Sequence, residues 1–585
     1  MKPETHTILA ADCGSATTQV VLIEKQNNIY RLVAEAKALS SHGPPRNDIT
    51  RGVTEAIEEI ESLSGRRLLA KTGEALFSTI ENEGVDVFVA LVSAAQPLRV
   101  LLAGLTTDVG LSAARKAITS TYLSVVEEIA LDDAQLGGEA EKIAAIQRAQ
   151  PDVILLVGGT DGGAEASALT LAQIIGSALE NTPANARPRI LYAGNTELRT
   201  EMAEIIGGLS DFKSLNNILP TVQQNALDDV QTELDRLYQQ LKLSQLPGFD
   251  TLTKWAANQI STTSKSFAQS IHYLGQSYNI NVLGVDIGSA SAAIAARREG
   301  FKRSLTRADA GVGSSLPALL AQVETETLTR WLPFEISEEA LRDFLHNKEL
   351  FPQSVPTTYR EILLELSAVR EALRLMLTQA KSIWQANETR RRKWSTWDLI
   401  VGSGQPLTQL PYPALSALAL LDALEPAGIF SLALDASGLV GMLGGIASVE
   451  PLAAAQVAGY DALLNLGTVI APLGIGRPGK TALKVKMTYR DKRELEMEIP
   501  FGAIEIIPLD ANEKADLEVH ATRNFGLHPD GGSFSRKMTA VVEGGVLGVI
   551  VDTRGRPIVL PSKDNERRQQ IQDWLLKLGL RTNDE

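Results

Sequence analysis

The chain has 585 residues, of which 44% are hydrophobic and 22% charged, and its 56 basic and 70 acidic side chains give a formal net charge of −14. This length predicts three or four domains of the usual ~100–200 residues, and the composition is that of a folded protein rather than a disordered one. The negative charge argues against broad attraction to nucleic acid or anionic lipid. The single cysteine, Cys13, excludes an internal disulfide and a cysteine-based metal cluster within one chain.

Residues 1–7 are polar and lack the features of a signal peptide. Charged residues and prolines interrupt the most apolar windows, residues 87–105 and 411–446, so we expect no membrane span. Together with the reduced cysteine, these features predict a cytoplasmic protein.

A polar loop between two apolar runs occupies residues 8–23, as in two buried strands joined by a turn. The loop, Asp12 to Thr18, supplies one carboxylate, one glycine and three hydroxyl side chains. The backbone N–H groups of such a loop can face phosphate oxygens. The alternative is a tight turn whose hydroxyls cap local backbone groups. A partial copy of the loop farther along the chain favours the phosphate interpretation.

Short apolar strands alternate with amphipathic helices from residue 30 to residue 192, which indicates a mainly parallel sheet. Strands are predicted at 30–38, 85–92, 151–157 and 189–192, and helices at 49–63, 111–119, 139–149 and 164–179. The strand at 151–157 runs into Gly-Gly-Thr-Asp-Gly-Gly at 158–163. Backbone donors at the N-terminus of the next helix favour an anion there. A plain glycine turn, in which Thr160 or Asp161 caps the helix, is the equal alternative.

The second half of the chain repeats these motifs after a charged, helical connector. A strand at 281–287 turns at Asp286-Ile287-Gly288-Ser289, which matches Asp12-Cys13-Gly14-Ser15 in its Asp, Gly and Ser. A long helical region, 337–384, precedes a strand at 397–401 that runs into Gly402-Ser403-Gly404, and we pair this turn with Gly158-Gly159. Two motifs that recur in the same order predict two related halves.

The composition changes after Gly467, where alternating apolar and polar residues predict a β-rich domain. A last amphipathic helix is predicted at 566–578.

Three other features suggest further chemistry only weakly. Cys13 ends a buried strand without a nearby histidine, which favours a small buried filler over a nucleophile. The six histidines lack metal-ligand spacing. The basic run Arg390 to Lys393 is either a solvated stretch or a docking site for an acidic partner.

Two halves with Asp-x-Gly-Ser loops and a late Val-Gly-Ser-Gly resemble the actin, heat-shock chaperone and sugar kinase superfamily of ribonuclease-H-like ATPases. Within this superfamily the chain resembles the MutL family that is encoded with adenosylcobalamin-dependent glutamate mutase. This MutL family is unrelated to the mismatch-repair protein called MutL. The motifs that carry this resemblance are Asp12 to Ser15, Gly158 to Gly163, Tyr192 to Asn195, Val282 to Gly288, Trp331 to Phe334, Arg370 to Arg374 and Asp398 to Gly404.

The resemblance implies an α/β fold of two ribonuclease-H-like (actin-like ATPase) halves with a helical connector, plus a β-rich C-terminal domain. The expected divisions are a first half at 1–215, a connector at 216–280, a second half with a helical insertion at 281–480, a β-rich domain at 481–565, and a terminal helix and tail at 566–585.

The resemblance also implies a nucleotide site between the halves, with ATP and magnesium as cofactors. Asp12 and Asp286 would hold magnesium through water. Phosphates would lie against Asp12, Gly14, Ser15, Thr17, Asp286, Gly288 and Ser289, and adenosine against Gly402, Ser403 and Gly404.

The sequence departs from the family pattern near the phosphates. The family's first loop continues Thr-Thr-Thr-Lys, whereas this chain has Ala16-Thr17-Thr18-Gln19. In the second loop, Gly-Ala-Thr-Thr-Asp is replaced by Ser289-Ala290-Ser291-Ala292-Ala293. Loss of a cation and a carboxylate predicts weaker hydrolysis, because positioned charges stabilise the transition state.

Three functional hypotheses follow from the resemblance. The first is an ATP-dependent activator or reactivator of a cobalamin-dependent mutase such as glutamate mutase, in which closure of the halves is the moving element. The second is a degenerate, non-hydrolysing ATPase that acts as a protein-interaction scaffold. The third is a small-molecule kinase, which is the weakest because no acid or base for an acceptor stands out. In each case we expect neither nucleic acid nor a membrane as a partner.

Overall fold

The computed structural model describes residues 5–78, 80, 82–133, 137–385, 397–527 and 535–580. The basic run Arg390 to Lys393 lies outside them. By compactness the chain forms two units. Unit 1 contains residues 1–94, 251–304 and 309–585, and unit 2 contains residues 95–250 and 305–308.

Unit 1 begins with a four-stranded sheet that carries Asp12. Its strand order is β3-β2-β1-β4, in which β1 pairs antiparallel with β2 and parallel with β4. The elements are β1 (Thr7–Cys13), β2 (Thr17–Gln26), β3 (Ile29–Leu39), α1 (Ile49–Ser64) and β4 (Val87–Val92). Helix α1 begins where the Asp48 side chain accepts a hydrogen bond from the Thr50 backbone N–H, and it ends at Gly65 in the left-handed conformation.

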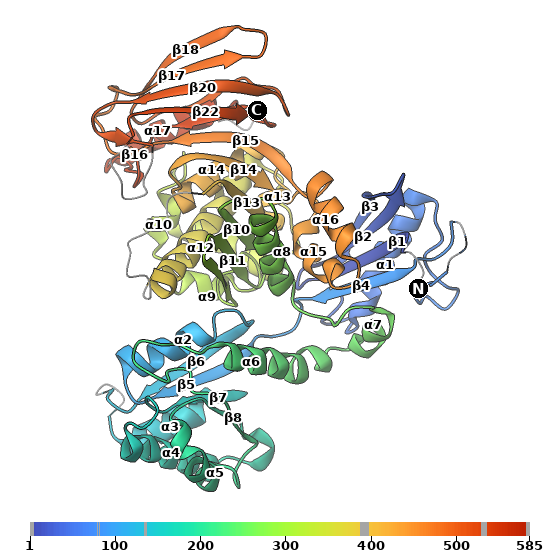
Figure 1. The fold of residues 1–585 in the computed structure, drawn as a ribbon, viewed down its shortest axis with the longest axis vertical. Coiled ribbons are helices and arrows are strands. Elements are labelled where there is room, and N and C mark those ends of the chain that lie inside the picture. The colour runs from blue at the N-terminus through green and yellow to red at the C-terminus, as the bar shows by residue number, and fades with distance from the viewer. Residues whose placement is uncertain are drawn as a thin grey trace. The chain divides into compact units, whose positions relative to one another are not determined.

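An eight-stranded sheet forms the second half of unit 1 (Figure 1). Its strand order is β12-β11-β10-β13-β14-β15-β23-β19. The strands are β10 (Val282–Ile287), β11 (Ala292–Arg298), β12 (Phe301–Arg307), β13 (Leu399–Ser403), β14 (Gly428–Leu434), β15 (Leu464–Ala471), β19 (Ile504–Ile507) and β23 (Val549–Asp552). Strand β10 pairs antiparallel with β11 and parallel with β13, as β1 does with β2 and β4. The two sheets therefore repeat one arrangement.

Helices accompany the second sheet throughout its sequence. They are α9 (Leu316–Leu320), α10 (Thr325–Thr329), α11 (Glu338–Leu350), α12 (Tyr359–Gln385), α13 (Gln405–Thr408), α14 (Pro413–Leu424), α15 (Leu439–Ala447) and α16 (Pro451–Tyr460). The long helix α12 packs against α14 and also contacts β11.

Two helices join the two sheets of unit 1 into one core. Helix α8 (Thr263–Ser277) and helix α15 pack against each other. Buried side chains of both helices share a cluster with Ile8 of β1 and Val89 of β4 in the first sheet, and with Val282 of β10 in the second. The two helices therefore lie in a core that both sheets share.

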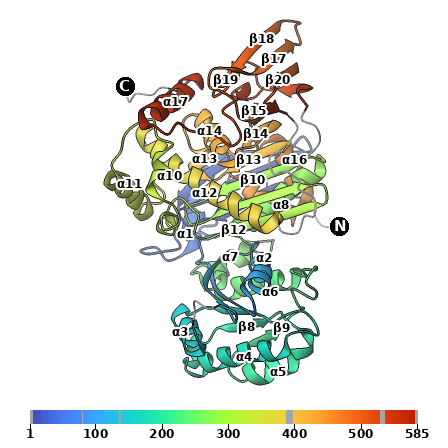
Figure 2. The ribbon, with the colours of Figure 1, turned by 90° about the vertical axis from the view of Figure 1, so that its left-hand side faces the viewer.

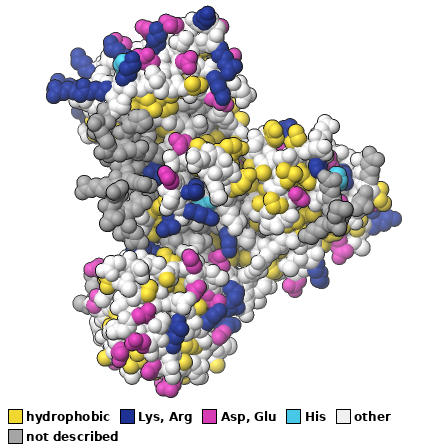
Figure 3. Space-filling view, viewed as in Figure 1, with side chains coloured by type: hydrophobic (Ala, Val, Ile, Leu, Met, Phe, Trp, Pro, Cys, Tyr) yellow, Lys and Arg dark blue, Asp and Glu magenta, His cyan; other side chains and the backbone are white. Residues whose placement is uncertain are grey.

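The C-terminal region adds a four-stranded antiparallel sheet of order β18-β17-β20-β22. Its elements, with a small accessory pair and the last helix, are β16 (Leu473–Gly474), β17 (Thr481–Tyr489), β18 (Glu494–Pro500), β20 (Lys514–Ala521), β21 (Phe525–Gly526), β22 (Lys537–Glu543) and α17 (Asp564–Lys577). One face shares a core with β15, β19 and β23 of the second sheet. Charged side chains of both signs cover this region in Figure 3, and cross-strand pairs such as Lys484–Glu498 at 2.6 Å keep exposed strands hydrated.

A buried ion network fixes the end of the chain to the second half. Arg554 donates to Asp422 of α14 at 2.7 Å and to Asp552 of β23 at 2.9 Å. Arg370 of α12 donates to the other oxygen of Asp422 at 2.7 Å, and Arg556 donates to Asp552 at 2.9 Å. Each of these five side chains is at most 3% exposed. Because charges this deeply buried must be paired, α12, α14 and β23 hold one another in place.

Unit 2 is built around a five-stranded, wholly parallel sheet of order β6-β5-β7-β8-β9. Its strands are β5 (Leu98–Gly104), β6 (Leu123–Ala130), β7 (Val153–Val157), β8 (Arg189–Tyr192) and β9 (Phe212–Ser214). Helices α3 (Glu139–Ala149), α4 (Glu165–Glu180) and α5 (Arg199–Ile206) cover one face, and α2 (Ser112–Ala117) and α6 (Asp228–Leu241) the other (Figures 1 and 2). Short turns at η1 (Thr107–Leu111), η2 (Ala184–Ala186), η3 (Thr196–Leu198) and η4 (Leu243–Gln245) complete the unit, and α7 (Phe249–Trp255) leads out of it. Numbered along the chain, this order is 2-1-3-4-5, that of a doubly wound fold.

The predicted fold class of two related α/β halves and a β-rich C-terminal region is confirmed. The five-part division stays a prediction, and its first part, residues 1–215, contributes strands to both units. The pairing of Gly158 with Gly402 is wrong, because β7 belongs to the separate sheet of unit 2. The counterpart of β13 is β4, since each pairs in parallel with an aspartate-bearing strand.

Among the described residues, none of the helices combines the length and the apolar character that crossing a bilayer requires.

Candidate functional site

Asp12 and Asp286 occupy equivalent places in the two sheets of unit 1. Asp12 is the penultimate residue of β1, and Asp286 is the penultimate residue of β10. In the antiparallel register, Gln19 lies opposite Asp12 and Ala293 lies opposite Asp286. The two departures that remove a charged side chain are therefore the residues paired with the two aspartates.

Tight turns follow both aspartates. The Gly14 N–H donates to the Thr17 carbonyl at 3.0 Å, and the Gly288 N–H donates to the Ser291 carbonyl at 2.8 Å. A Cβ at Gly14 would lie 2.7 Å from the Thr17 carbonyl oxygen, so this turn requires glycine. The two loops thus share their hydrogen bonding as well as their sequence.

Burial is the main influence on the protonation of the two carboxyls. Burial, together with the nearby charge of Asp286, raises the pKa of Asp12 to about 7, although a hydrogen bond from Thr263 opposes the shift. Burial raises the pKa of Asp286 to about 6, against a hydrogen bond from Ser403. The charge of Asp286 therefore disfavours ionisation of Asp12, and a cation between the two carboxyls would relieve that repulsion.

The donor set fits a magnesium ion that is held through water. Within the described residues, there is no group of three or more His, Cys, Asp and Glu side chains arranged to hold a metal directly. Magnesium retains much of its hydration shell and needs only one or two carboxylates. Asp12 and Asp286 supply oxygen ligands of that kind.

Side-chain amides join the first-half loop to the second half. Gln405, the first residue of α13, donates from Nε2 to Thr17 Oγ1 at 2.7 Å. Gln19 Nε2 donates to the Ser437 carbonyl at 2.5 Å. Thr17, a predicted phosphate contact, and Gln19, a departure from the family pattern, therefore both form hydrogen bonds with the second half.

Ser403 lies between two carboxyl groups. Its Oγ donates to Asp435 Oδ2 at 3.0 Å, and its hydroxyl also acts on the pKa of Asp286. Asp435 follows β14, is 1% exposed, and accepts a second hydrogen bond from the Val440 N–H at 3.1 Å. Burial raises the pKa of Asp435 to about 7, and the charge of Asp286 adds to the shift.

The remaining predicted residues border the same region. Ser289 Oγ accepts from the Ser314 N–H at 3.0 Å. Gly404 has φ +94°, and a Cβ there would lie 1.9 Å from the Ile287 carbonyl oxygen, so the turn after β13 packs on the end of β10. Ser15 lies in the first turn. The structure thus brings the predicted residues around two aligned loops, while their roles stay predictions.

Sequence reasoning missed Thr263, Gln405 and Asp435. Thr263 begins α8 and donates from Oγ1 to Asp12 Oδ1 at 2.6 Å. Gln405 directly follows the predicted glycine turn, and Asp435 directly follows a buried strand, which is the signal that identified Asp12 and Asp286. Cys13 is buried and free, and burial raises the pKa of its thiol, which agrees with a filler role.

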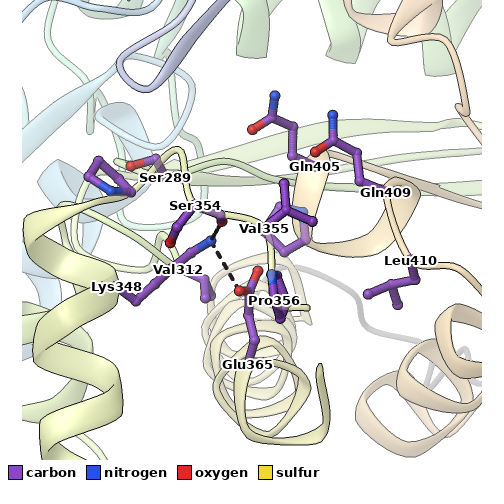
Figure 4. A pocket seen from close by; sticks show the side chains of 12 residues that line it. Ser289, Val312, Lys348, Ser354, Val355, Pro356, Glu365, Gln405, Gln409 and Leu410 are labelled. Carbon is purple, nitrogen blue, oxygen red and sulfur yellow. Dashed lines mark hydrogen bonds and ion pairs between the residues drawn. The ribbon is translucent and has the colours of Figure 1, made fainter. Parts of the chain in front are cut away.

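A small pocket adjoins Ser289 and Gln405 (Figure 4). The ion pair of Lys348 and Glu365, 3.0 Å apart, forms one wall, and Gln405 and Gln409 form another. Lys348 Nζ also donates to the Ser354 carbonyl at 2.5 Å. Burial raises the pKa of Glu365, although Lys348 opposes the shift. The cavity measures about 20 Å³, which is room for about one water molecule.

Comparison with known proteins identifies the family of this chain. The profile described as MutL protein matches residues 8–461, a span that includes both aspartate loops and Asp435. The chain belongs to the MutL protein family. "Protein MutL" of Clostridium tetanomorphum is 21% identical over 299 residues, which cover 50% of this chain. The match spans 58% of the length of that MutL relative.

Solved structures also align with this MutL family chain at low identity. A nucleotide-free acetone carboxylase aligns with a TM-score of 0.33 and 10% identity, over 85% of this chain and 82% of that chain. The activator of 2-hydroxyisocaproyl-CoA dehydratase from Clostridium difficile, with bound ADPNP, aligns with a TM-score of 0.27 and 10% identity, over 78% and 98%. A nucleotide-free diol dehydratase-reactivating factor aligns with a TM-score of 0.28 and 10% identity, over 76% and 99%.

Proposed function

We propose that this chain is a nucleotide-binding accessory protein, an ATP-dependent activator or reactivator of an adenosylcobalamin-dependent mutase such as glutamate mutase. The observation that carries the nucleotide site is the pair of part-buried carboxyls, Asp12 and Asp286, at equivalent strand ends. Burial raises the pKa of each carboxyl well above the ordinary aspartate value. A cation bound between them would favour their charged forms.

The proposed nucleotide lies between the two aspartate loops. The turns that begin at Gly14 and Gly288 provide backbone donors, and Thr17 and Ser289 provide hydroxyls for the phosphates. Magnesium, held through water by Asp12 and Asp286, would supply charge neutralisation at the phosphates.

The adenosine is proposed to lie beside Gly402, Ser403 and Gly404. The Ser403 hydroxyl faces carboxyl groups, so Gly404 and the adjoining pocket offer the contact surface for the base.

The partner is proposed from family membership, because the chain resembles the MutL family that is encoded with adenosylcobalamin-dependent glutamate mutase. Side-chain contacts between the halves, such as Gln405 with Thr17, provide a means for nucleotide to alter their closure. Closure would then load or release the partner enzyme.

The proposal is tested by calorimetric titration of the full chain with magnesium-ATP. We expect binding by the unsubstituted protein and at least ~10-fold weaker binding by Asp12→Ala and by Asp286→Ala, because each removes a carboxylate from the cation site. Ser367→Ala is a matched control, because Ser367 is buried in α12 and donates only to the Leu364 carbonyl. No heat of binding by the unsubstituted protein would overturn the nucleotide site.

A non-hydrolysing scaffold is a second candidate, and one observation favours it. Gln19 and Ala293 leave both aspartates without the cation and carboxylate of the family pattern, and Gln19 is committed to the Ser437 carbonyl. Measurement of phosphate release separates the two candidates. Binding without release supports the scaffold, whereas phosphorylation of a small acceptor would support the weaker kinase alternative.

A further inference from the structure

The short loop that follows β14, residues 435–438, contacts both halves of the candidate site. We name these residues, Asp435-Ala436-Ser437-Gly438, the junction loop. The backbone N–H of Asp435 donates to the Gly402 carbonyl at 2.8 Å, and the Gly438 N–H donates back to the Asp435 carbonyl at 3.2 Å. Helix α15 begins directly after the loop, at Leu439.

The Asp435 side chain connects the second aspartate loop to α15. One oxygen accepts from Ser403 at 3.0 Å, and the other accepts from the Val440 N–H in the first turn of α15 at 3.1 Å. Ser403 lies beside Asp286 in the parallel register of β13 with β10. A single buried carboxyl therefore fixes both a neighbour of Asp286 and the start of the helix.

The other end of the junction loop receives the first half. The Ser437 carbonyl accepts from Gln19 at 2.5 Å. Gly438, at φ +63°, makes room for this contact, because a Cβ there would lie 2.6 Å from Gln19 Oε1. Gln19 lies opposite Asp12 in the antiparallel register of β1 with β2. The loop thus contacts the immediate neighbours of both aspartates.

Helix α15 carries the position of the loop into the shared core. Leu439, Val440 and Met442 are buried in the cluster that includes β1 and β4 of the first sheet and β10 of the second. Glycine at 445 admits close packing, since its Cβ would lie 3.1 Å from Val89 and 3.2 Å from Leu91. A displacement of the loop would therefore move packed side chains between the sheets.

We propose that Asp435 is a positioning residue of the nucleotide site: it holds Ser403 beside Asp286 and fixes the junction loop so that Gln19, opposite Asp12, and helix α15 respond to nucleotide together. This inference rests on the proposed nucleotide binding. It assigns to Asp435 no contact with the nucleotide itself. Residues that orient metal-binding groups in this way commonly change metal affinity 10- to 100-fold when replaced.

The test compares Asp435→Asn, Gln19→Ala and the double variant, with Ser367→Ala as the control. Asparagine keeps the shape of the side chain and one acceptor oxygen, but it removes the charge and one of the two acceptors. Each single variant is expected to weaken magnesium-ATP binding about 10-fold in calorimetric titration. Because both changes release the same loop, the double variant should bind within about threefold of the weaker single variant rather than ~100-fold below the unsubstituted chain.

A second measurement follows α15 directly. Hydrogen exchange of peptides covering residues 439–447 is expected to change when magnesium-ATP saturates the unsubstituted chain and to stay unchanged in Asp435→Asn at saturation. A merely structural role would leave this ligand response intact. Ser403→Ala removes the same hydrogen bond from its other side and serves where Asp435→Asn fails to accumulate.

The outcomes distinguish failure of the proposed nucleotide binding from failure of the role assigned to Asp435. If the unsubstituted chain does not bind magnesium-ATP, the proposed function fails and takes this inference with it. If it binds, but the two single effects multiply in the double variant, or the exchange response of residues 439–447 persists in Asp435→Asn, the inference alone is overturned.

Discussion

At the scale of single residues, the interior of unit 1 holds carboxyl groups under conditions that disfavour their charge. Asp435 is 1% exposed, and burial raises its pKa to about 7 from an ordinary value of 3.8. The pKa values of Asp12 and Asp286 are also raised. A site built this way gives up stability at neutral pH, which is a common cost of a functional arrangement of like charges.

The pH dependence of stability follows from this shift. Between about pH 4 and pH 7 the folded chain holds a proton on Asp435 that the unfolded chain has released, so the free energy of unfolding falls as the pH rises through this window. Across the whole of this window, ionisation of Asp435 should lower the free energy of unfolding by about 2–4 kcal/mol. We expect Asp435→Asn, which cannot ionise, to lose less stability than the unsubstituted chain between pH 5 and pH 8.

Denaturant midpoints at the two pH values measure this prediction. The asparagine variant should show the smaller fall in the free energy of unfolding between these two pH values, even though it binds nucleotide more weakly. Equal losses of stability in both proteins would show that Asp435 ionises as an ordinary aspartate does.

At the scale of elements, the turn between β13 and α13 depends on one glycine. Gly404 has φ +94° and no room for a Cβ, which would meet the Ile287 carbonyl at 1.9 Å. Gly300, between β11 and β12, also has positive φ, at +66°, but nothing lies within 4 Å of its Cβ position. A side chain at Gly300 would therefore meet backbone strain alone, whereas a side chain at Gly404 would meet both backbone strain and a steric clash.

We expect Gly404→Ala to destabilise the chain more than Gly300→Ala does. The Gly300 substitution should cost ~1–2 kcal/mol of left-handed strain, whereas the Gly404 substitution adds displacement of β10 and should cost at least ~3 kcal/mol. Thermal denaturation followed by circular dichroism gives both values. Similar costs would mean that the turn can move away from Ile287.

The same elements show what the sequence could and could not predict. Asp12 and Asp286 were found because strand, aspartate and glycine turn are adjacent in sequence. Gln405 and Gln19 reach their partners across 388 and 418 residues, and Thr263 reaches Asp12 across 251. Such contacts exist only after the sheets are packed, so no local pattern predicts them.

The mistaken pairing of Gly158 with Gly402 has a different cause. A strand that runs into glycines occurs in every parallel α/β sheet, and here the loop at Gly158 belongs to the separate sheet of unit 2. Asn195 and Asn217 hold that loop through hydrogen bonds to Gly162 and Gly159. The alternating pattern predicted a parallel sheet correctly, but it contained no sign that a new sheet begins after β4.

At the scale of the whole molecule, unit 2 has what an independent domain needs. It has its own core, which includes Leu101, Ile154 and Ile190 on neighbouring strands, and nearly all of its residues come from one continuous segment. We expect a fragment of residues 95–250 to fold alone, because only residues 305–308 of the unit are missing from it.

Calorimetry of the isolated fragment tests this expectation, and it should show one cooperative transition. A shorter fragment, residues 95–200, lacks β9, α6 and nearly all of α5 and should show none, because an edge strand and a helix from each face of the sheet are lost. Absence of a transition in the longer fragment would mean that unit 2 needs the rest of the chain to fold.

The position of β23 sets the order in which the protein can be completed during synthesis. This strand is made from residues 549–552, yet it lies between β15 and β19 in the second sheet. Until the ribosome has delivered it, together with the arginines that follow it, β15 has an open edge and Asp422 has Arg370 but not Arg554 as a buried partner. Open strand edges are where nascent chains associate wrongly. The second half can therefore close only after residues 549–556 have been made, and messages truncated before this strand should yield chains that aggregate rather than shortened working proteins.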